Sequence, residues 1–169
     1  MPIMESPPPP LAPRLREIFD AGAGEPIEGG HFLPLTTLES GARLGLDASA
    51  AWIIVPDGSD GGPPRVYAPA QAHIFYEVLE TRRHDFDDAV EAAAQAAGLP
   101  GEEVLFSFPA VPVVRAVLAK GLPYLSRLAL LWLRNTELRE LRADILAVSK
   151  SVDMPHALRE LAAQLVVPE

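Results

Sequence analysis

The chain contains 169 residues, of which 49% are hydrophobic, and it carries a formal net charge of −9. This length fits one domain, or one domain with a tail, and allows a sizeable hydrophobic core. The acidic balance argues against a nucleic-acid binder, because such a protein needs a basic surface that neutralises phosphates. The sequence has no cysteine, which excludes disulfides, iron–sulfur clusters, thiolate zinc sites and cysteine nucleophiles.

Neither a secretory signal nor a membrane-spanning segment is expected. The N-terminus lacks a basic region followed by an apolar run. The uncharged runs elsewhere are short and are interrupted by proline and glycine, so none is suited to cross a bilayer. We therefore expect a cytoplasmic protein, and its high use of Ala, Pro, Arg and Leu is typical of GC-rich bacterial genomes.

Residues 1–13 are rich in proline and are expected to form a disordered tail. The run 7–10 favours polyproline II and lacks a flanking basic residue, so we favour a plain tail over a ligand for an aromatic groove. Apolar residues in the range 11–21 also recur at helical spacing and predict a short amphipathic helix there. Residues 14–169 are expected to form a single globular domain, with an α/β-hairpin part (14–69) and a helical part (70–169).

The clearest β signal is the segment 51–55, which is rich in β-branched and aromatic residues. Turn-forming residues follow, and the segment 65–68 resumes an alternating pattern, so the two segments predict a hairpin. Residues 31–35 are a candidate third strand. Residues 36–44 are interpreted as a helix, capped by Thr36 or Thr37 and stopped by Gly45.

The chain after residue 69 is predicted to be helical. Helices are expected over 70–83 and 85–97, and the pattern leaves open whether they are separate. The longest apolar stretch, 104–134, predicts two helices joined by a corner at 120–123, and further helices are expected over 135–150 and 155–166. The predicted fold class is α+β and predominantly α-helical, with a small antiparallel β-hairpin or three-stranded sheet near the N-terminus packed on a helical bundle.

Charge is unevenly distributed along the chain. Residues 1–100 contain six Lys and Arg against fifteen Asp and Glu, whereas residues 101–169 contain eight of each class. The segment 77–91 has a net charge of −4, and the apolar segment 104–134 has four basic residues and no acid. These segments are expected to face each other in the fold or to be solvated; alternatively, the basic segment meets an acidic partner or lipid head groups.

No catalytic signature accompanies these features. The glycine-rich segment 56–62 lacks the GK[ST] sequence of a phosphate-binding loop, and no G-x-S-x-G motif is present. We therefore expect a non-enzymatic interaction protein without a cofactor: an adaptor, regulatory or immunity-type subunit that binds another protein. Aromatic and arginine side chains concentrate binding energy at interfaces. The candidate partner-binding residues of the apolar, basic segment are Tyr124, Arg127, Trp132 and Arg134, and Trp132→Ala is expected to abolish partner capture with little effect on the fold.

The alternative is a small metal-dependent enzyme or ligand-binding protein. Imidazole and carboxylate groups a turn apart on one helix can share a metal ion, and such ligands suit Zn, Mn or Fe. The candidate metal ligands are His73, Glu77, Glu80 and His84. A third interpretation is peripheral association with anionic lipids, and the oligomeric state is left open.

Overall fold

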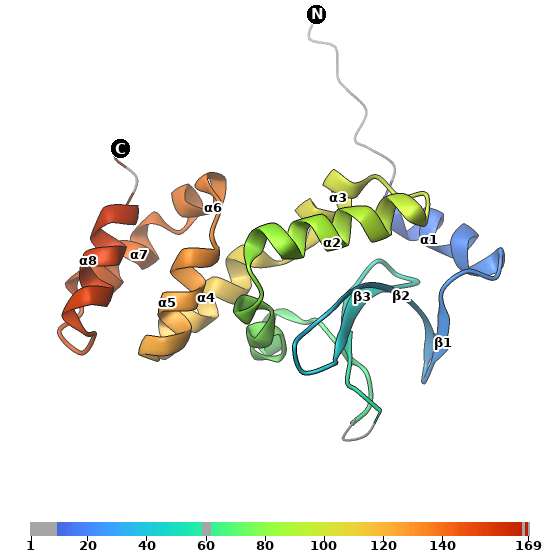
Figure 1. Cartoon of the computed structure of the whole chain (residues 1–169), viewed down its shortest axis with the longest axis horizontal. Helices are drawn as coiled ribbons and strands as arrows, with labels where there is room; N and C mark the ends of the chain where they lie inside the picture. Colours follow the sequence, from blue (N-terminus) through green and yellow to red (C-terminus); the bar gives the residue numbers. More distant parts are fainter. Residues whose placement is uncertain (1–9, 59–61, 167, 169) are drawn as a thin grey trace, which may run out of the picture.

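The computed structural model describes residues 10–58, 62–166 and 168. This part of the chain is 57% helical and contains eight α-helices and a five-stranded antiparallel sheet. The α+β, helix-dominated fold class predicted from the sequence is therefore confirmed, with a larger sheet than expected. The sheet lies at one end of the molecule, and the C-terminal helices form the other end (Figure 1).

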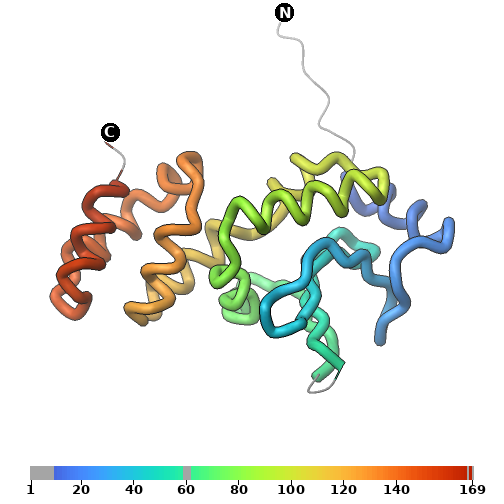
Figure 2. Tube along the Cα trace, in the orientation of Figure 1, coloured from blue at the N-terminus to red at the C-terminus, as the bar shows by residue number. Residues whose placement is uncertain are grey.

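The elements follow one another through short connections, and their order is traced in Figure 2. The strands are β1 (Glu25–Ile27), β2 (Gly30–Thr37), β3 (Arg43–Asp47), β4 (Trp52–Val55) and β5 (Arg65–Val66). The helices are α1 (Leu11–Asp20), the 3-10 segment η1 (Pro69–Glu80), α2 (Arg83–Ala96), α3 (Gly101–Ser107), α4 (Ala110–Lys120), α5 (Pro123–Trp132), α6 (Asn135–Glu140), α7 (Arg142–Lys150) and α8 (His156–Leu165).

The strands form an antiparallel meander in the order β1-β2-β3-β4-β5. The predicted helix over 36–44 is wrong, because β2 continues to Thr37 and β3 begins at Arg43. A tight turn joins them: the N–H of Leu38 donates to the carbonyl of Ala42 at 2.8 Å, and Gly41 adopts a φ of +89°. The hairpin of β4 with β5 and the strand over 31–35 are confirmed.

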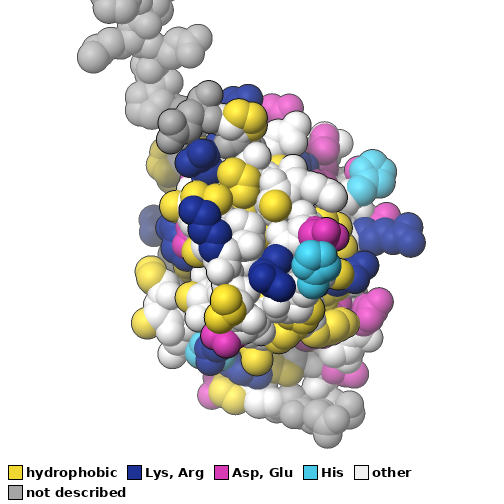
Figure 3. Space-filling model, turned by 90° about the vertical axis from the view of Figure 1, so that its left-hand side faces the viewer, with side chains coloured by type: hydrophobic (Ala, Val, Ile, Leu, Met, Phe, Trp, Pro, Cys, Tyr) yellow, Lys and Arg dark blue, Asp and Glu magenta, His cyan; other side chains and the backbone are white. Residues whose placement is uncertain are grey.

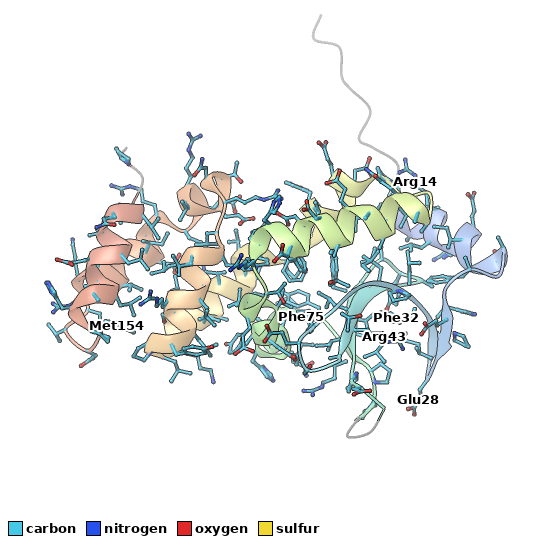
Figure 4. All side chains as sticks on the ribbon, in the orientation of Figure 1. Arg14, Glu28, Phe32, Arg43, Phe75 and Met154 are labelled. Atoms are coloured by element: carbon cyan, nitrogen blue, oxygen red, sulfur yellow. The ribbon has the colours of Figure 1, made fainter. Side chains whose placement is uncertain are left out.

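One face of the sheet packs against α2, which crosses it (Figure 1). Leu44 and Leu46 of β3 are fully buried and belong to the hydrophobic core. The sheet curves into a half-barrel, and Phe32 and Arg43 lie within its curve (Figure 4). The Arg43 guanidinium lies 5.5 Å from the centroid of the Phe32 ring and pairs with Glu25 of β1, so the edge strand folds over the buried ring.

The helical part follows the proline and glycine signals of the sequence. The expected corner at 120–123 is present, because Gly121 ends α4 in the left-handed conformation (φ +71°) and Pro123 opens α5. The first residues of the apolar stretch belong to α3. The helix expected over 135–150 is divided at Leu141 into α6 and α7, and α8 begins directly after Pro155.

A single cluster of buried hydrophobic residues extends from Leu15 of α1 to Ala162 of α8. Aromatic side chains join the sheet to the helices within it. Trp52 of β4 packs edge-on against Phe108 at 5.0 Å, and its indole N–H donates to the Ser107 hydroxyl at 3.0 Å. The core therefore runs through the whole described length of the molecule.

Residues 1–9, which make up most of the expected proline-rich tail, and residues 59–61 of the expected hairpin loop lie outside the described residues. Helix α1 begins at Leu11, so the last part of the predicted tail is helical. In the part of the chain that the structure describes, no helix combines the length and the apolar character needed to cross a membrane.

Candidate protein-docking site

Two of the four predicted partner-binding residues belong to a cluster at the start of α2. Trp132 is only 2% exposed, and its indole N–H donates to the carbonyl of Thr81 at 3.1 Å. The Trp132 ring packs on Phe86 at a centroid distance of 5.4 Å. Arg134, at the junction of α5 and α6, forms an ion pair with Asp87 of α2.

The guanidinium of Arg83 holds this cluster together. Its Nε donates to Asp87 at 3.0 Å, and its Nη1 and Nη2 donate to the two carboxylate oxygens of Glu137 at 2.6 and 2.9 Å. The group also lies 4.1 Å from the centroid of the Trp132 ring. Burial lowers the pKa of Arg83, but hydrogen bonds and charges from Glu137 and Asp87 outweigh it and raise the pKa above its ordinary value.

The cluster joins α2 to the α5–α6 junction and is an element of the fold. Through Asp87 and Arg134, the acidic segment 77–91 and the basic segment 104–134 do face each other here. Trp132 is predicted to bind a partner, but its ring lies beneath Arg83 in the core. Replacing it therefore removes core packing rather than a surface contact.

The four predicted metal ligands do not converge. His73, Glu77 and Glu80 lie on η1, where a 3-10 turn of three residues places groups four apart on different faces. His84 lies on a different helix, because η1 ends before α2 begins. Glu77 accepts a hydrogen bond from the Ser40 N–H at 3.2 Å, and His84 lies 3.2 Å from Asp88. No group of three or more such ligands that could hold a metal ion occurs among the described residues.

The other two predicted residues, Tyr124 and Arg127, line a groove between α5 and α8. The groove has a volume of about 440 Å³, and we call it the α5–α8 groove. Its walls are formed by Pro123, Tyr124, Arg127 and Leu131 of α5 and by Pro155, Ala157, Leu158 and Leu161 in and before α8. Seven of these eight residues are apolar or aromatic, and none is acidic.

The α5 wall presents its apolar groups to solvent. Tyr124, Arg127 and Leu131 lie three and four residues apart and therefore share one helical face. Tyr124 is 66% exposed and Leu131 is 59% exposed. The opposite face of α5 carries Ala129 and Leu130, which are buried, so the core leaves the exposed side chains uncovered. Figure 3 shows hydrophobic side chains lying between Lys and Arg on the end of the molecule formed by α7 and α8.

Arg127 is the single charged group in the groove, and it makes no ion pair with any residue that the structure describes. The other wall of the groove comes from α8, which sequence periodicity identified as a helix but could not place beside α5. The groove can therefore bind an apolar side chain and, one helical turn away, accept a carboxylate at Arg127.

A second hollow of about 510 Å³ lies beside the Arg83 cluster. Its rim includes Phe106 of α3, which is 92% exposed, together with the carboxylates Glu102 and Glu140. Phe106 belongs to the apolar stretch 104–134 but is not among the predicted partner-binding residues. Its position two residues from the buried Val104 is the signal that could have identified it, because that spacing turns a side chain to the opposite face of a helix.

Comparison of the chain with protein-family models, with curated proteins and with solved structures finds no match.

Proposed function

We propose that this chain is a non-enzymatic protein-interaction module, an adaptor or regulatory subunit, which binds a partner protein through the α5–α8 groove. The observation that carries the proposal is the exposure of Tyr124 and Leu131 beside an apolar groove that contains Arg127, which has no ion-pair partner among the described residues. Apolar patches rimmed by polar groups mark interaction sites, and tyrosine and arginine are enriched among the residues that dominate binding energy.

The groove also defines the chemistry of its occupant. A segment that inserts apolar side chains between α5 and α8 removes Tyr124 and Leu131 from water, which is the main driving force for association. A carboxylate on the same segment would pair with Arg127, which is otherwise left without a counter-charge when water is excluded. The partner segment therefore combines apolar and acidic side chains.

Site-specific photocrosslinking tests the proposal. A photoreactive phenylalanine replaces Tyr124 in the groove, and a matched chain carries it at Glu28, in the turn between β1 and β2 (Figure 4). The partner crosslinked at Tyr124 is then purified, and its affinity is measured for the wild type and for Leu131→Glu. We expect at least about tenfold weaker binding by Leu131→Glu, because a charge is desolvated in the groove.

Two results would contradict the proposal. One is equal crosslinking of the same protein from both positions, which would show that the groove does not select it. The other is an unchanged affinity of the Leu131→Glu chain for the purified partner while far-ultraviolet circular dichroism confirms an intact fold.

A further inference from the structure

Phe106 of α3 is the most exposed large hydrophobic side chain among the described residues, with 92% of its surface in contact with solvent. Val104 faces the core and is 0% exposed. A side chain two positions further lies about 200° around the helix, so Phe106 faces directly away from the molecule. The ring makes no aromatic contact with the described residues.

A carboxylate accompanies this ring at the distance of one helical turn. Glu102 lies four residues before Phe106 on the same face of α3, is exposed and forms no ion pair with any described residue. The neighbouring Glu103 is different, because it lies 3.6 Å from Arg14 of α1. We call Glu102 and Phe106 the α3 knob.

The α5–α8 groove presents the complementary arrangement. Arg127 lies one helical turn from Leu131 and just under one turn from Tyr124, so the groove has an apolar surface next to a cation that is unpaired among the described residues. The knob has an apolar ring next to a carboxylate that is likewise unpaired among the described residues. Both spacings are about 6 Å along a helix at a rise of 1.5 Å per residue, so both contacts can form at once.

We propose that the α3 knob of a second copy of this chain occupies the α5–α8 groove, with Phe106 packed against Leu131 and Glu102 paired with Arg127. The inference rests on the proposed function of the groove as a protein-docking site and identifies its partner. α3 lies apart from α5 and α8, whose residues form the groove, so a copy does not fill its own groove (Figure 1). The contact is therefore head-to-tail, and each copy retains a free knob or a free groove.

The size of the contact sets its strength. An inserted aromatic side chain buries about 150–250 Å². Stable complexes bury roughly 1,200–2,000 Å² in total, so the knob gives a weak contact unless neighbouring surfaces add to it. We expect reversible association with a dissociation constant in the micromolar to millimolar range. At this affinity, the chains are monomeric in dilute samples.

A charge exchange between two variants tests the proposal by sedimentation equilibrium from micromolar to millimolar chain concentration. Glu102→Arg places a cation on the knob opposite the native Arg127, and Arg127→Glu places an anion in the groove opposite the native Glu102. Each variant alone is expected to associate at least about tenfold more weakly than the wild type, because like charges then meet. In the mixture, the knob of each variant meets an opposite charge in the groove of the other, so we expect the two variants to associate in a one-to-one ratio.

Matched control variants make the same kinds of charge reversal at positions outside the knob and the groove. Glu28→Arg lies in the turn between β1 and β2, and Lys150→Glu lies at the end of α7, so neither is part of the knob or groove. Both are expected to associate as the wild type does, and Phe106→Ser is expected to be monomeric with an unchanged circular dichroism spectrum. The exposed side chains of the knob and groove are outside the core, so these variants fold.

Two outcomes overturn the inference. A wild type that stays monomeric over the whole concentration range excludes the homotypic contact. A mixture of Glu102→Arg with Arg127→Glu that associates no better than either variant excludes this pairing of knob and groove. Neither outcome affects the proposed function, because a different protein crosslinked from Tyr124 and sensitive to Leu131→Glu would still establish the groove as a docking site.

Discussion

Replacement of Arg83 by methionine should destabilise the chain more than any comparable change at an exposed ion pair. Arg83 binds Asp87 and Glu137, whose side chains are only 10% and 14% exposed. Methionine preserves much of the apolar packing over Trp132 but provides no donor for the carboxylates. Glu137 loses both of its guanidinium contacts, while Asp87 retains Arg134.

The magnitude follows from leaving one shielded carboxylate without its cation. Breaking a buried ion pair on one side costs about 3–5 kcal/mol, and we expect about 3 kcal/mol for Arg83→Met because Asp87 keeps a partner. Glu137→Gln in the same chain removes the stranded charge, so the double variant should be more stable than the sum of the single changes predicts. We expect a coupling energy of about 2 kcal/mol between the two positions.

Urea unfolding followed by far-ultraviolet circular dichroism measures these free energies from the backbone signal, which is preferable to tryptophan fluorescence because Arg83 lies over the Trp132 ring. Arg115→Met is the matched control, because Arg115 and its partner Asp144 are 52% and 30% exposed at a distance of 3.3 Å. That change should alter stability by at most about 0.5 kcal/mol. If Arg83→Met costs no more than Arg115→Met, the cluster contributes nothing as a tie between α2 and the α5–α6 junction.

Three further changes have outcomes that the packing determines. Gly45→Ala should destabilise the sheet strongly, because its Cβ would lie 1.9 Å from a carbonyl oxygen of β2, whereas Gly58→Ala meets nothing within 4 Å and should be neutral in urea unfolding. Trp132→Ala should lower the free energy of unfolding by about 3–5 kcal/mol, so that a soluble, fully folded variant at ordinary temperature would argue against its burial. Burial raises the pKa of Tyr67 and Tyr76 above 10.0, so the unfolded chain loses these protons first, and stability should fall as pH rises above that value. Replacing both tyrosines by phenylalanine should weaken this alkaline loss.

The sequence predicted those elements whose ends carry strong backbone signals. Gly121 and Pro123 fix the corner between α4 and α5, and Pro155 fixes the start of α8, because each residue restricts the backbone independently of its surroundings. Strand β3 was missed for the opposite reason. Its alternating leucines are interrupted by Gly45, a poor strand former, and the close approach to β2 that requires glycine exists only in the assembled sheet.

The candidate site was predictable in part. Tyr124 and Arg127 fall on one face of a helix whose apolar residues are numerous enough to supply both a core and a surface, and the structure places both in the groove. Trp132 belongs to the same stretch, but its environment depends on Arg83, which is distant in sequence and reaches it only through the fold. Local sequence patterns therefore located the α5 wall of the groove. They did not place Trp132 correctly, because its burial depends on a contact with the sequence-distant Arg83.

The fold does not require the exposed apolar side chains of the groove and the knob. Leu131 and Phe106 are 59% and 92% exposed, so changing either to serine should alter the free energy of unfolding by no more than about 0.5 kcal/mol. Polar replacement should also increase solubility, since an exposed apolar patch promotes association. A loss of more than about 1 kcal/mol in either variant, measured by urea unfolding, would show that these side chains stabilise the monomer. Unchanged stability together with lost association would instead separate the surface that binds from the core that folds.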